Sequence, residues 1–203
     1  MLEFKANGGS KIVGLGSCAE YKFESGSALS ESSITKPLTA YGKSKLEVYR
    51  FLSQLDLDFL WVRTFYQYGP EDYPPKFIAS LLSAFEKNLD FELQDPAGQR
   101  DYVYIEDVVE ILYKLIIKGS KGVFNIGTGN SISGYDIASL AHRAMRERGK
   151  IVFSNEDLRS GKIFASTEKL EGELGPIKWT DVESGIKIMI AERMISRRGE
   201  DIK

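Results

Sequence analysis

Tyr41 and Lys45 are side chains whose types and spacing suit acid–base chemistry. They stand four residues apart in the segment YGKSK, so on a helix they share one face, with Cβ atoms roughly 6 Å apart. At about 4 Å and an effective dielectric constant near 20, an ammonium group favours a phenolate by roughly 4 kcal/mol. Because one pKa unit is worth about 1.4 kcal/mol, this attraction could lower the pKa of the phenol from about 10 towards neutrality. Such a tyrosine can accept the proton of a hydroxyl group while hydride leaves the same carbon.

The pattern around this pair predicts the elements that must position it. Residues 11–16 form an apolar run that predicts a buried strand, and the Ser- and Gly-rich residues 22–36 predict a loop. A helix is expected from about residue 41 to 54, with Leu46 and Leu52 on its apolar face. Residues 58–65 (DFLWVRTF) predict a second buried strand. The strand–helix–strand order indicates a parallel sheet.

The rest of the chain continues the alternation of helices and strands. Later strands are expected at residues 102–105, 122–127 and 150–154. Further helices are expected from Pro74-Pro75 to about residue 85, from Glu106 through Val109, Leu112 and Ile116 to Gly119, over 137–148, and after Trp179.

Glycines at the end of the first strand match a dinucleotide-binding pattern in part. Residues 14–19 (GLGSCA) fit G-x-G-x-x-G/A after a strand, but that fingerprint requires a helix to follow at once, whose amides hold a pyrophosphate. The segment that follows is poorly periodic, and no strand ending in an acidic residue comes about 20 residues later. Close packing at a strand end is the better interpretation. A self-sufficient dinucleotide binder using this loop stays the weakest of three hypotheses.

Composition narrows the class of protein. The chain has 203 residues with 42% hydrophobic and 28% charged residues, as in an ordinary globular protein. A net charge of −2 argues against nucleic acid or an anionic membrane as the main partner. One cysteine and one histidine permit neither an internal disulfide nor a Cys/His zinc site, and no metal is expected. The first ten residues lack the apolar core of a signal peptide, so a cytoplasmic location is expected.

Five segments, in family order, resemble the extended short-chain dehydrogenases of the NAD-dependent epimerase/dehydratase family, which modify nucleotide sugars. The segment PLTAYGKSK is similar to the family's Tyr-Gly-x-Ser-Lys helix start. Residues 16–21 (GSCAEY) resemble the strand end that carries the catalytic Ser or Thr. The other three resemble R-x-F-N-x-Y-G-P, R-D-Y-I-x-V-x-D and Y-N-I-G-T-G: VRTFYQYGP at 62–70, RDYVYIED at 100–107 and VFNIGTG at 123–129. Each is weak alone, and together they cover most of the chain.

The resemblance implies a role for each candidate site residue. Tyr41 is the acid/base, Lys45 lowers its pKa and bonds the nicotinamide ribose of NAD or NADP, and Ser17 bonds the reacting sugar hydroxyl. Tyr66, Arg100 and Arg159 are substrate-binding candidates. Arg100 would contact the substrate pyrophosphate, because a guanidinium suits phosphate. Its alternative is a partner for Asp101 or Asp107. For Arg159, a surface arginine is the favoured interpretation over a second phosphate contact.

Three departures from the family pattern limit these expectations. Tyr66 stands where many members carry Asn. Cys18-Ala19 replaces the Asp-Glu pair of the 4,6-dehydratases, which disfavours a dehydratase. The sequence starts near the end of the helix before the Ser17 strand. The N-terminal part of the Rossmann domain, with its glycine-rich loop, is therefore expected to be absent.

These observations predict an α/β fold: a partial Rossmann-type parallel sheet flanked by helices, with a smaller mixed C-terminal substrate lobe. Residues 1–66 and 104–128 are assigned to the truncated Rossmann-type domain, and residues 67–103 and 129–195 to the lobe. The favoured function is an NAD(P)-dependent nucleotide-sugar epimerase or 4-ketoreductase acting through a keto-sugar. The alternative is an inactive truncated fragment that at most binds a sugar nucleotide. A homodimer, or a chain supplying the missing half, is an expected partner.

Overall fold

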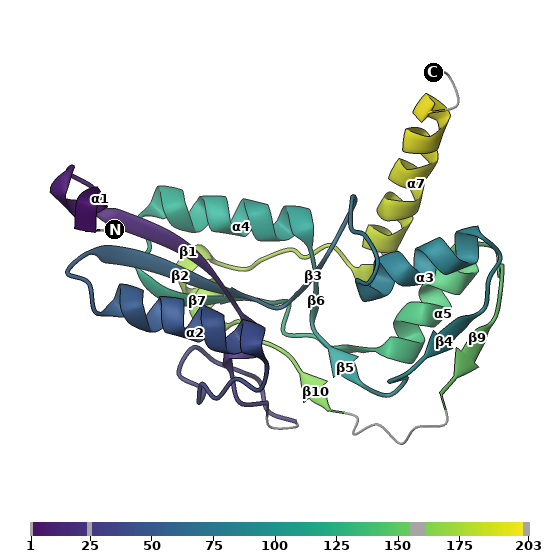
Figure 1. Cartoon of the computed structure of the whole chain (residues 1–203), viewed down its shortest axis with the longest axis horizontal. Coiled ribbons are helices and arrows are strands. Elements are labelled where there is room, and N and C mark those ends of the chain that lie inside the picture. The colour runs from purple at the N-terminus through teal and green to yellow at the C-terminus, as the bar shows by residue number, and fades with distance from the viewer. Residues whose placement is uncertain (1, 24–25, 155–160, 201–203) are drawn as a thin grey trace.

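The main sheet is parallel and three-stranded, in the order β1 (Lys11–Ser17), β2 (Asp58–Thr64) and β7 (Gly122–Ile126). The computed structural model describes residues 2–23, 26–154 and 161–200. Ser17 pairs in register with Thr64, which in turn pairs with Ile126, so the three carboxyl ends lie at one edge of the sheet. Helix α2 (Ala40–Ser53) covers one face and α4 (Ile105–Lys118) the other (Figure 1). The predicted α/β fold with a helix-flanked parallel sheet is confirmed.

Glycines in β1 make room for a tryptophan from the neighbouring strand. A Cβ atom added at Gly14 would lie 2.5 Å from the ring of Trp61, and one at Gly16 would lie 2.4 Å from the Trp61 indole nitrogen. After β1 the chain enters a three-residue 3-10 turn, η1 (Cys18–Glu20), and the described residues between it and α2 contain no α-helix. The interpretation of these glycines as packing residues is therefore confirmed.

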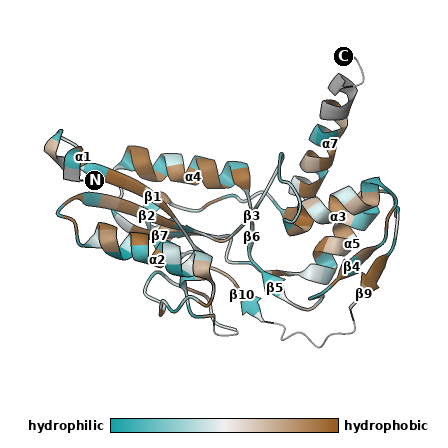
Figure 2. Cartoon of the chain, viewed as in Figure 1, coloured by the Kyte–Doolittle hydropathy of each residue, from teal (hydrophilic) through white to brown (hydrophobic). Residues whose placement is uncertain are grey.

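Helix α4 buries a different stripe from the one that the sequence suggested. Its buried residues are Val108, Ile111 and Leu115, whereas Val109 is 59% exposed and Ile116 is 39% exposed. Figure 2 shows that much of the helix is apolar, and its apolar residues spread over a wide arc, so periodicity alone could not identify the buried side. Gly119 ends the helix in the left-handed conformation, as expected.

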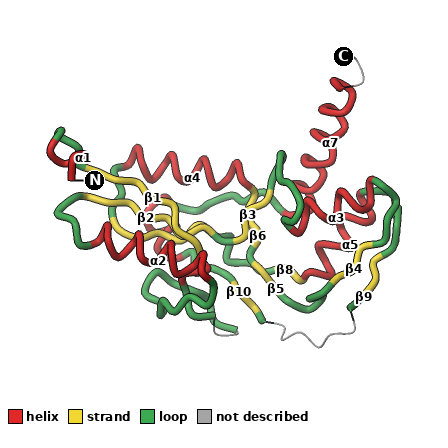
Figure 3. The backbone as a smooth tube through the Cα atoms, viewed as in Figure 1, coloured by secondary structure: helices red, strands yellow, loops and turns green. Residues whose placement is uncertain are grey.

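The second part of the molecule is built on three helices and several very short strands (Figure 3). Helices α3 and α5 pack on each other and α5 packs on α7, whose C-terminal half projects away from the body in Figure 1. The helices are α3 (Phe77–Glu86), α5 (Gly134–Ala144) and α7 (Val182–Glu200). The strands are β3 (Tyr66–Tyr68), β4 (Phe91–Leu93), β5 (Gln99–Arg100), β6 (Tyr102–Tyr104), β8 (Ile132–Ser133), β9 (Ile151–Phe153) and β10 (Lys162–Ile163).

Helix α5 begins and ends earlier than predicted. It covers 134–144 where 137–148 was expected, because Arg146 and Glu147 adopt left-handed backbone angles that stop the helix. Helix α3, in contrast, begins later than predicted, at Phe77, two residues after Pro75. His142 stacks on Phe85 at 5.1 Å and its ring nitrogen lies 3.0 Å from the Gly149 carbonyl, a packing environment.

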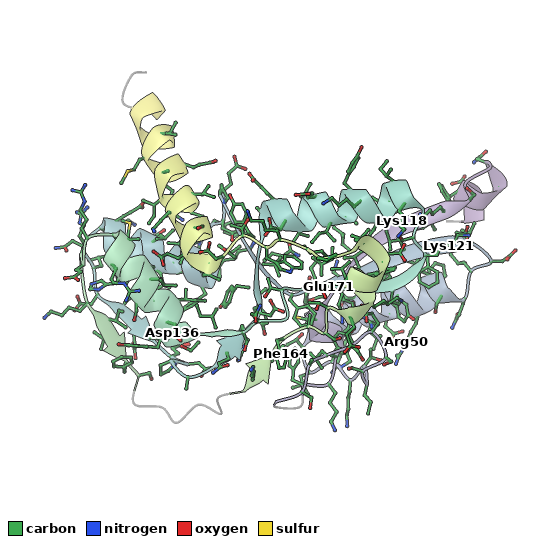
Figure 4. All side chains as sticks on the ribbon, turned by 180° about the vertical axis from the view of Figure 1, so that it is seen from behind. Arg50, Lys118, Lys121, Asp136, Phe164 and Glu171 are labelled. Carbon is green, nitrogen blue, oxygen red and sulfur yellow. The ribbon has the colours of Figure 1, made fainter. Side chains whose placement is uncertain are left out.

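Two hydrophobic clusters hold the molecule together. The first lies around the main sheet, and the second lies between α3, α5 and α7. The first also takes in Ile163, Ala165 and Leu170, from β10 to helix α6 (Glu168–Leu174). Figure 4 shows this side from behind, with Glu171 on α6 and Lys118 at the end of α4. The residue boundaries proposed for the two domains stay a prediction.

One short segment at the N-terminus completes the description. Helix α1 (Leu2–Ala6) precedes β1, and Asn7 bonds back to its Glu3 carbonyl. Within the described ranges, no helix combines the length and the apolar character needed to cross a membrane.

Candidate active site

Ser17 lies at the carboxyl end of β1 and caps the turn that follows. Its Oγ accepts a hydrogen bond from the Ala19 amide at 3.2 Å, and its own amide donates to the Glu20 carboxylate at 2.9 Å. The side chain is half-buried. The turn therefore fixes the backbone of Ser17 at the edge of the sheet where parallel-strand proteins bind their ligands.

Tyr41 and Lys45 lie one turn apart at the start of α2, and the structure brings them together. The Lys45 ammonium is 5.7 Å from the centre of the Tyr41 ring. It also donates a hydrogen bond to the Leu15 carbonyl of β1 at 2.9 Å. The Tyr41 side chain is 57% exposed, so its hydroxyl is open to a ligand. Lys45 thus ties the helix to the strand that ends in Ser17.

Gly42 sets how closely α2 approaches the Ser17 turn. A Cβ atom at Gly42 would lie 2.2 Å from the Ala19 carbonyl oxygen, a distance that no side chain tolerates. Thr39 caps the helix by accepting from the Gly42 amide at 3.0 Å. Tyr41, next to Gly42, and Ser17, two residues before Ala19, are therefore brought to the same corner of the molecule.

A buried ion pair beneath this corner was not foreseen from the sequence. Arg63 Nε donates to the Glu20 carboxylate at 2.8 Å, and the two side chains are 2% and 0% exposed. Trp61 Nε1 also donates to Glu20, at 3.1 Å. The S-x-x-E pattern of a capping box could have identified the contact between Ser17 and Glu20, but not the pairing of Glu20 with Arg63.

A cleft of about 440 Å³ contains two of the predicted substrate-binding residues, Tyr66 and Arg100. The Arg100 guanidinium lies 5.9 Å from the centre of the Tyr66 ring, which is 5.7 Å from the Tyr102 ring. Burial, with a smaller contribution from Cys18, raises the pKa of Tyr66 to about 12. The cleft is lined in addition by aromatic and polar side chains that include Phe77, Phe91, Glu92, Gln94, Asp95 and Tyr102.

The alternative partners expected for Arg100 were wrong. Arg100 pairs with Asp95 at 3.3 Å and donates to the Gly161 carbonyl at 2.7 Å. Asp101 is fully buried and accepts bonds from the loop after β7, at Thr128 and Gly129, and from Ala165. Asp107 accepts from Thr180. Neighbouring residues of an extended chain point to opposite sides, which separates Asp101 from Arg100.

Arg159 lies outside the described residues. Among the residues that the structure does describe, no group of three or more His, Cys, Asp or Glu side chains is placed to hold a metal ion.

The site fits one end of a nicotinamide dinucleotide. Tyr41 and Lys45 present a phenol and an ammonium, groups that suit a ribose and a reacting hydroxyl, at the edge of the sheet. The Gly14–Gly16 stretch does not fit a pyrophosphate, because Trp61 fills the space over both glycines. In the described part of the chain, β1 is therefore not followed by the cradle that the dinucleotide motif requires.

Comparison with known proteins places this site in a family. Residues 2–127 match the NAD dependent epimerase/dehydratase family. An ADP-L-glycero-D-manno-heptose-6-epimerase of Nitratidesulfovibrio vulgaris is 30% identical over 174 residues, covering 74% of this chain and 53% of the relative. The chain spans about half the length of the curated relatives it matches.

Solved structures show the same fold. The UDP-glucose 4-epimerase of Thermotoga maritima, solved with UDP-glucose, superposes with a TM-score of 0.85 at 20% identity, covering 96% of this chain and 67% of that one. The protein RMD from Pseudomonas aeruginosa, solved with NADPH, gives a TM-score of 0.84 at 20% identity, covering 94% and 69%. With a family match over more than half of its residues, this chain belongs to the NAD-dependent epimerase/dehydratase family of enzymes.

Proposed function

We propose that this chain carries the catalytic groups of an NAD(P)-dependent nucleotide-sugar epimerase or 4-ketoreductase that acts through a keto-sugar. One observation carries the proposal. The Gly42–Ala19 contact and the Lys45–Leu15 hydrogen bond bring Ser17, Tyr41 and Lys45 to one corner of the sheet. A proton acceptor, a cation beside it and a hydroxyl donor are the groups that oxidation of a secondary alcohol needs.

Each residue has a defined task in this reaction. Ser17 hydrogen-bonds the reacting sugar hydroxyl and orients it, and Tyr41 takes the hydroxyl proton as the C–O bond becomes a carbonyl. Lys45 stabilises the phenolate by its charge. When bound, the nicotinamide cofactor supplies hydride acceptance and return. In the reverse direction Tyr41 gives its proton back to the carbonyl oxygen.

The cleft beside this corner suits the diphosphate of a nucleotide sugar. Arg100 offers a guanidinium that pairs well with phosphate. Tyr66 lies beside Arg100 and packs against the hydrophobic cluster that contains Cys18. A sugar attached to a diphosphate on Arg100 would extend past Tyr66 towards Ser17. Tyr66 replaces the Asn common in the family, so its contact with substrate is a phenol contact. Arg159 is proposed as a second phosphate ligand.

The cofactor is NAD or NADP, and its pyrophosphate needs contacts that the Gly14 loop does not offer. A homodimer partner or another chain supplies them in this proposal. A 4,6-dehydratase is disfavoured, because Cys18 and Ala19 cannot do the work of two carboxyl groups.

Titration of the purified chain with NADH and NADPH tests the proposal. Fluorescence of the bound dihydronicotinamide should report micromolar binding, and UDP- or dTDP-sugars should then be epimerised or reduced. Tyr41→Phe should keep most of the cofactor affinity while turnover falls roughly 10²–10⁴-fold, the usual range for a lost acid/base group.

The alternative, an inactive fragment, predicts that the chain does not bind cofactor. If a chain that melts cooperatively binds no cofactor at concentrations up to millimolar, the hypothesis that this chain is an active enzyme by itself is wrong. That result would leave a folded fragment that at most binds a sugar nucleotide.

A further inference from the structure

The Glu20–Arg63 pair lies at a junction between three elements of the site. Glu20 belongs to the turn after β1, and Arg63 belongs to β2. The Glu20 carboxylate accepts three different donors: the Ser17 amide at 2.9 Å, Trp61 Nε1 at 3.1 Å and Arg63 Nε at 2.8 Å. One buried carboxylate therefore connects the backbone of Ser17 to two side chains of the neighbouring strand.

The arginine extends this connection to α2. Its guanidinium lies between two aromatic rings, 4.7 Å from the centre of Tyr21 and 5.0 Å from the centre of Tyr49. Tyr49 follows Lys45 by one helical turn on the face that also carries Tyr41, and its ring lies 5.9 Å from that of Trp61. The helix with Tyr41 and Lys45 therefore packs on the same guanidinium that binds the Ser17 turn.

The far side of Arg63 is occupied too. Arg63 Nη1 donates to the Tyr21 hydroxyl at 3.1 Å, and that hydroxyl donates to Asn125 Oδ1 at 2.7 Å. The side-chain nitrogen of Asn125, Nδ2, donates to the Leu29 carbonyl at 2.8 Å. The pair thus has bonded neighbours in β7 and in the loop before α2.

We infer that Glu20 and Arg63 are positioning residues that hold the Ser17 turn and the Tyr41–Lys45 helix in fixed relation to each other. The effect of this positioning on turnover rests on the function proposed above. The effect on the geometry of the Ser17 turn does not rest on it. A buried ion pair adds little stability over apolar residues of similar volume, because desolvating two charges offsets their attraction. The geometry instead supports a role for the ion pair in positioning the Ser17 turn and helix α2.

A double variant separates positioning from stability. Glu20→Met should lower the melting temperature by roughly 6–20 °C, because it leaves Arg63 buried without its charge partner. Glu20→Met/Arg63→Met removes both charges and should recover most of that loss. The Ser17 amide and Trp61 still lack their acceptor in the double variant, so the Ser17 turn should remain misplaced.

Cys18 reports the order of the turn without any need for activity. It is the only cysteine in the chain, it follows Ser17 directly, and its side chain is 5% exposed. Burial raises the pKa of its thiol to about 12, so labelling by a disulfide reagent at pH 8 should be slow. Well below the melting temperature, Glu20→Met should label at least about 10-fold faster, and the double variant should label equally fast despite its recovered melting temperature.

A matched control uses an ion pair far from the turn. Arg193 of α7 contacts Glu86 of α3 at 3.5 Å, on two helices that contribute to the second hydrophobic cluster. Arg193→Met should lower the melting temperature without changing the rate at which Cys18 is labelled. If Glu20→Met does not fold, Glu20→Gln keeps an oxygen for the Ser17 amide and should label at an intermediate rate.

Labelling and turnover together give decisive outcomes. Wild-type labelling rates in the double variant would overturn the positioning role and leave a purely structural pair. If wild type turns over a nucleotide sugar, kcat of the double variant should fall at least about 10-fold with KM within about 3-fold. If wild type shows no turnover at all, the proposed function fails, and the labelling rates still decide the role of the pair.

Discussion

Arg100 shows how a single side chain can be prepared for an anion. Its guanidinium is held by two backbone carbonyls, Gln99 at 2.9 Å and Gly161 at 2.7 Å, and by the Asp95 carboxylate at 3.3 Å. A fork with several donors can keep these bonds and still present N–H groups to the cleft. A lysine has one nitrogen on a flexible stem and cannot do both.

Arg100→Lys should therefore weaken binding of UDP- or dTDP-sugars at least about 10-fold, through loss of a bidentate contact to phosphate. NADH affinity should not change, because the proposed arrangement assigns Arg100 to the substrate diphosphate and not to the cofactor. Calorimetric titration with each ligand measures the two effects separately. The matched control is Arg50→Lys on the exposed face of α2, which should bind both ligands as wild type does. Equal loss of NADH affinity in Arg100→Lys would contradict the assignment.

At the scale of elements, the start of α2 is the joint on which the site depends. The helix is pressed onto the Ala19 carbonyl at a position where only glycine fits. Its other anchors are the Thr39 cap and the Lys45 bond to β1. Displacement of this helix start would move Tyr41 and Lys45 together, away from Ser17.

Gly42→Ala should destabilise the protein by about 1–3 kcal/mol, the usual cost of forcing extra volume into a packed contact. It should also lower turnover, because the start of α2 must shift and Tyr41 shifts with it. The same substitution at Gly172 in α6 meets nothing within 4 Å and should stabilise the protein by about 0.5–1 kcal/mol. Urea unfolding of both variants measures the contrast, and equal stabilities would refute the contact.

The elements that sequence could predict are those with strong periodic patterns. Strands β1, β2 and β7 and helices α2 and α4 lie where they were expected, within about two residues. Two of the three-residue strands, β6 and β9, also lie within residues predicted as strands, 102–105 and 150–154. The strands β3, β4, β5, β8 and β10 were not predicted, because each depends on a partner distant in the chain. Strand β5, for example, pairs with β8 and with β10. The end of α5 was missed because left-handed Arg146 and Glu147 carry no sequence signal.

For the candidate site, the sequence supplied residues but not their contacts. Motif spacing identified Ser17, Tyr41 and Lys45, whose separation in space only the fold determines. The Arg100–Asp95 pair was missed because the partner was sought among adjacent acidic residues. The Glu20–Arg63 pair joins residues 43 apart in the chain, and no local pattern predicts such a contact.

At the scale of the whole molecule, buried tyrosines occur in both hydrophobic clusters and between them. Burial raises the pKa of Tyr21 and of Tyr66 to about 12, and it raises the pKa of Tyr68 and of Tyr102 further. Tyr21 belongs to the first cluster and Tyr68 to the second, while Tyr66 and Tyr102 pack at their margins. Ionisation of these phenols is therefore coupled to the unfolding of both parts.

Alkaline pH should unfold the protein cooperatively. In the unfolded chain these tyrosines lose protons near pH 10, whereas in the folded chain they keep them to about pH 12 or beyond. The unfolded state binds fewer protons in this window, so stability is complete below about pH 10 and falls as pH rises through it. Phenolate absorbance at 295 nm should show at least four of the ten tyrosines ionising in one step with the loss of helical circular dichroism. A smooth titration of all ten in a chain that stays folded would contradict this expectation.

The Tyr21–Asn125 hydrogen bond can form only late in translation, relative to the Glu20–Arg63 ion pair. Its two residues are 104 positions apart, and Asn125 also binds the Leu29 carbonyl in the loop before α2. A ribosome adding about 5–20 residues per second needs roughly 3–12 s to pass from Arg63 to Asn125. During that interval the emerging chain contains Glu20 and Arg63. It does not yet contain Asn125 of β7, which bonds to Tyr21 and to Leu29 in the loop before α2. The corner that carries Ser17, Tyr41 and Lys45 is thus completed only after β7 has been translated.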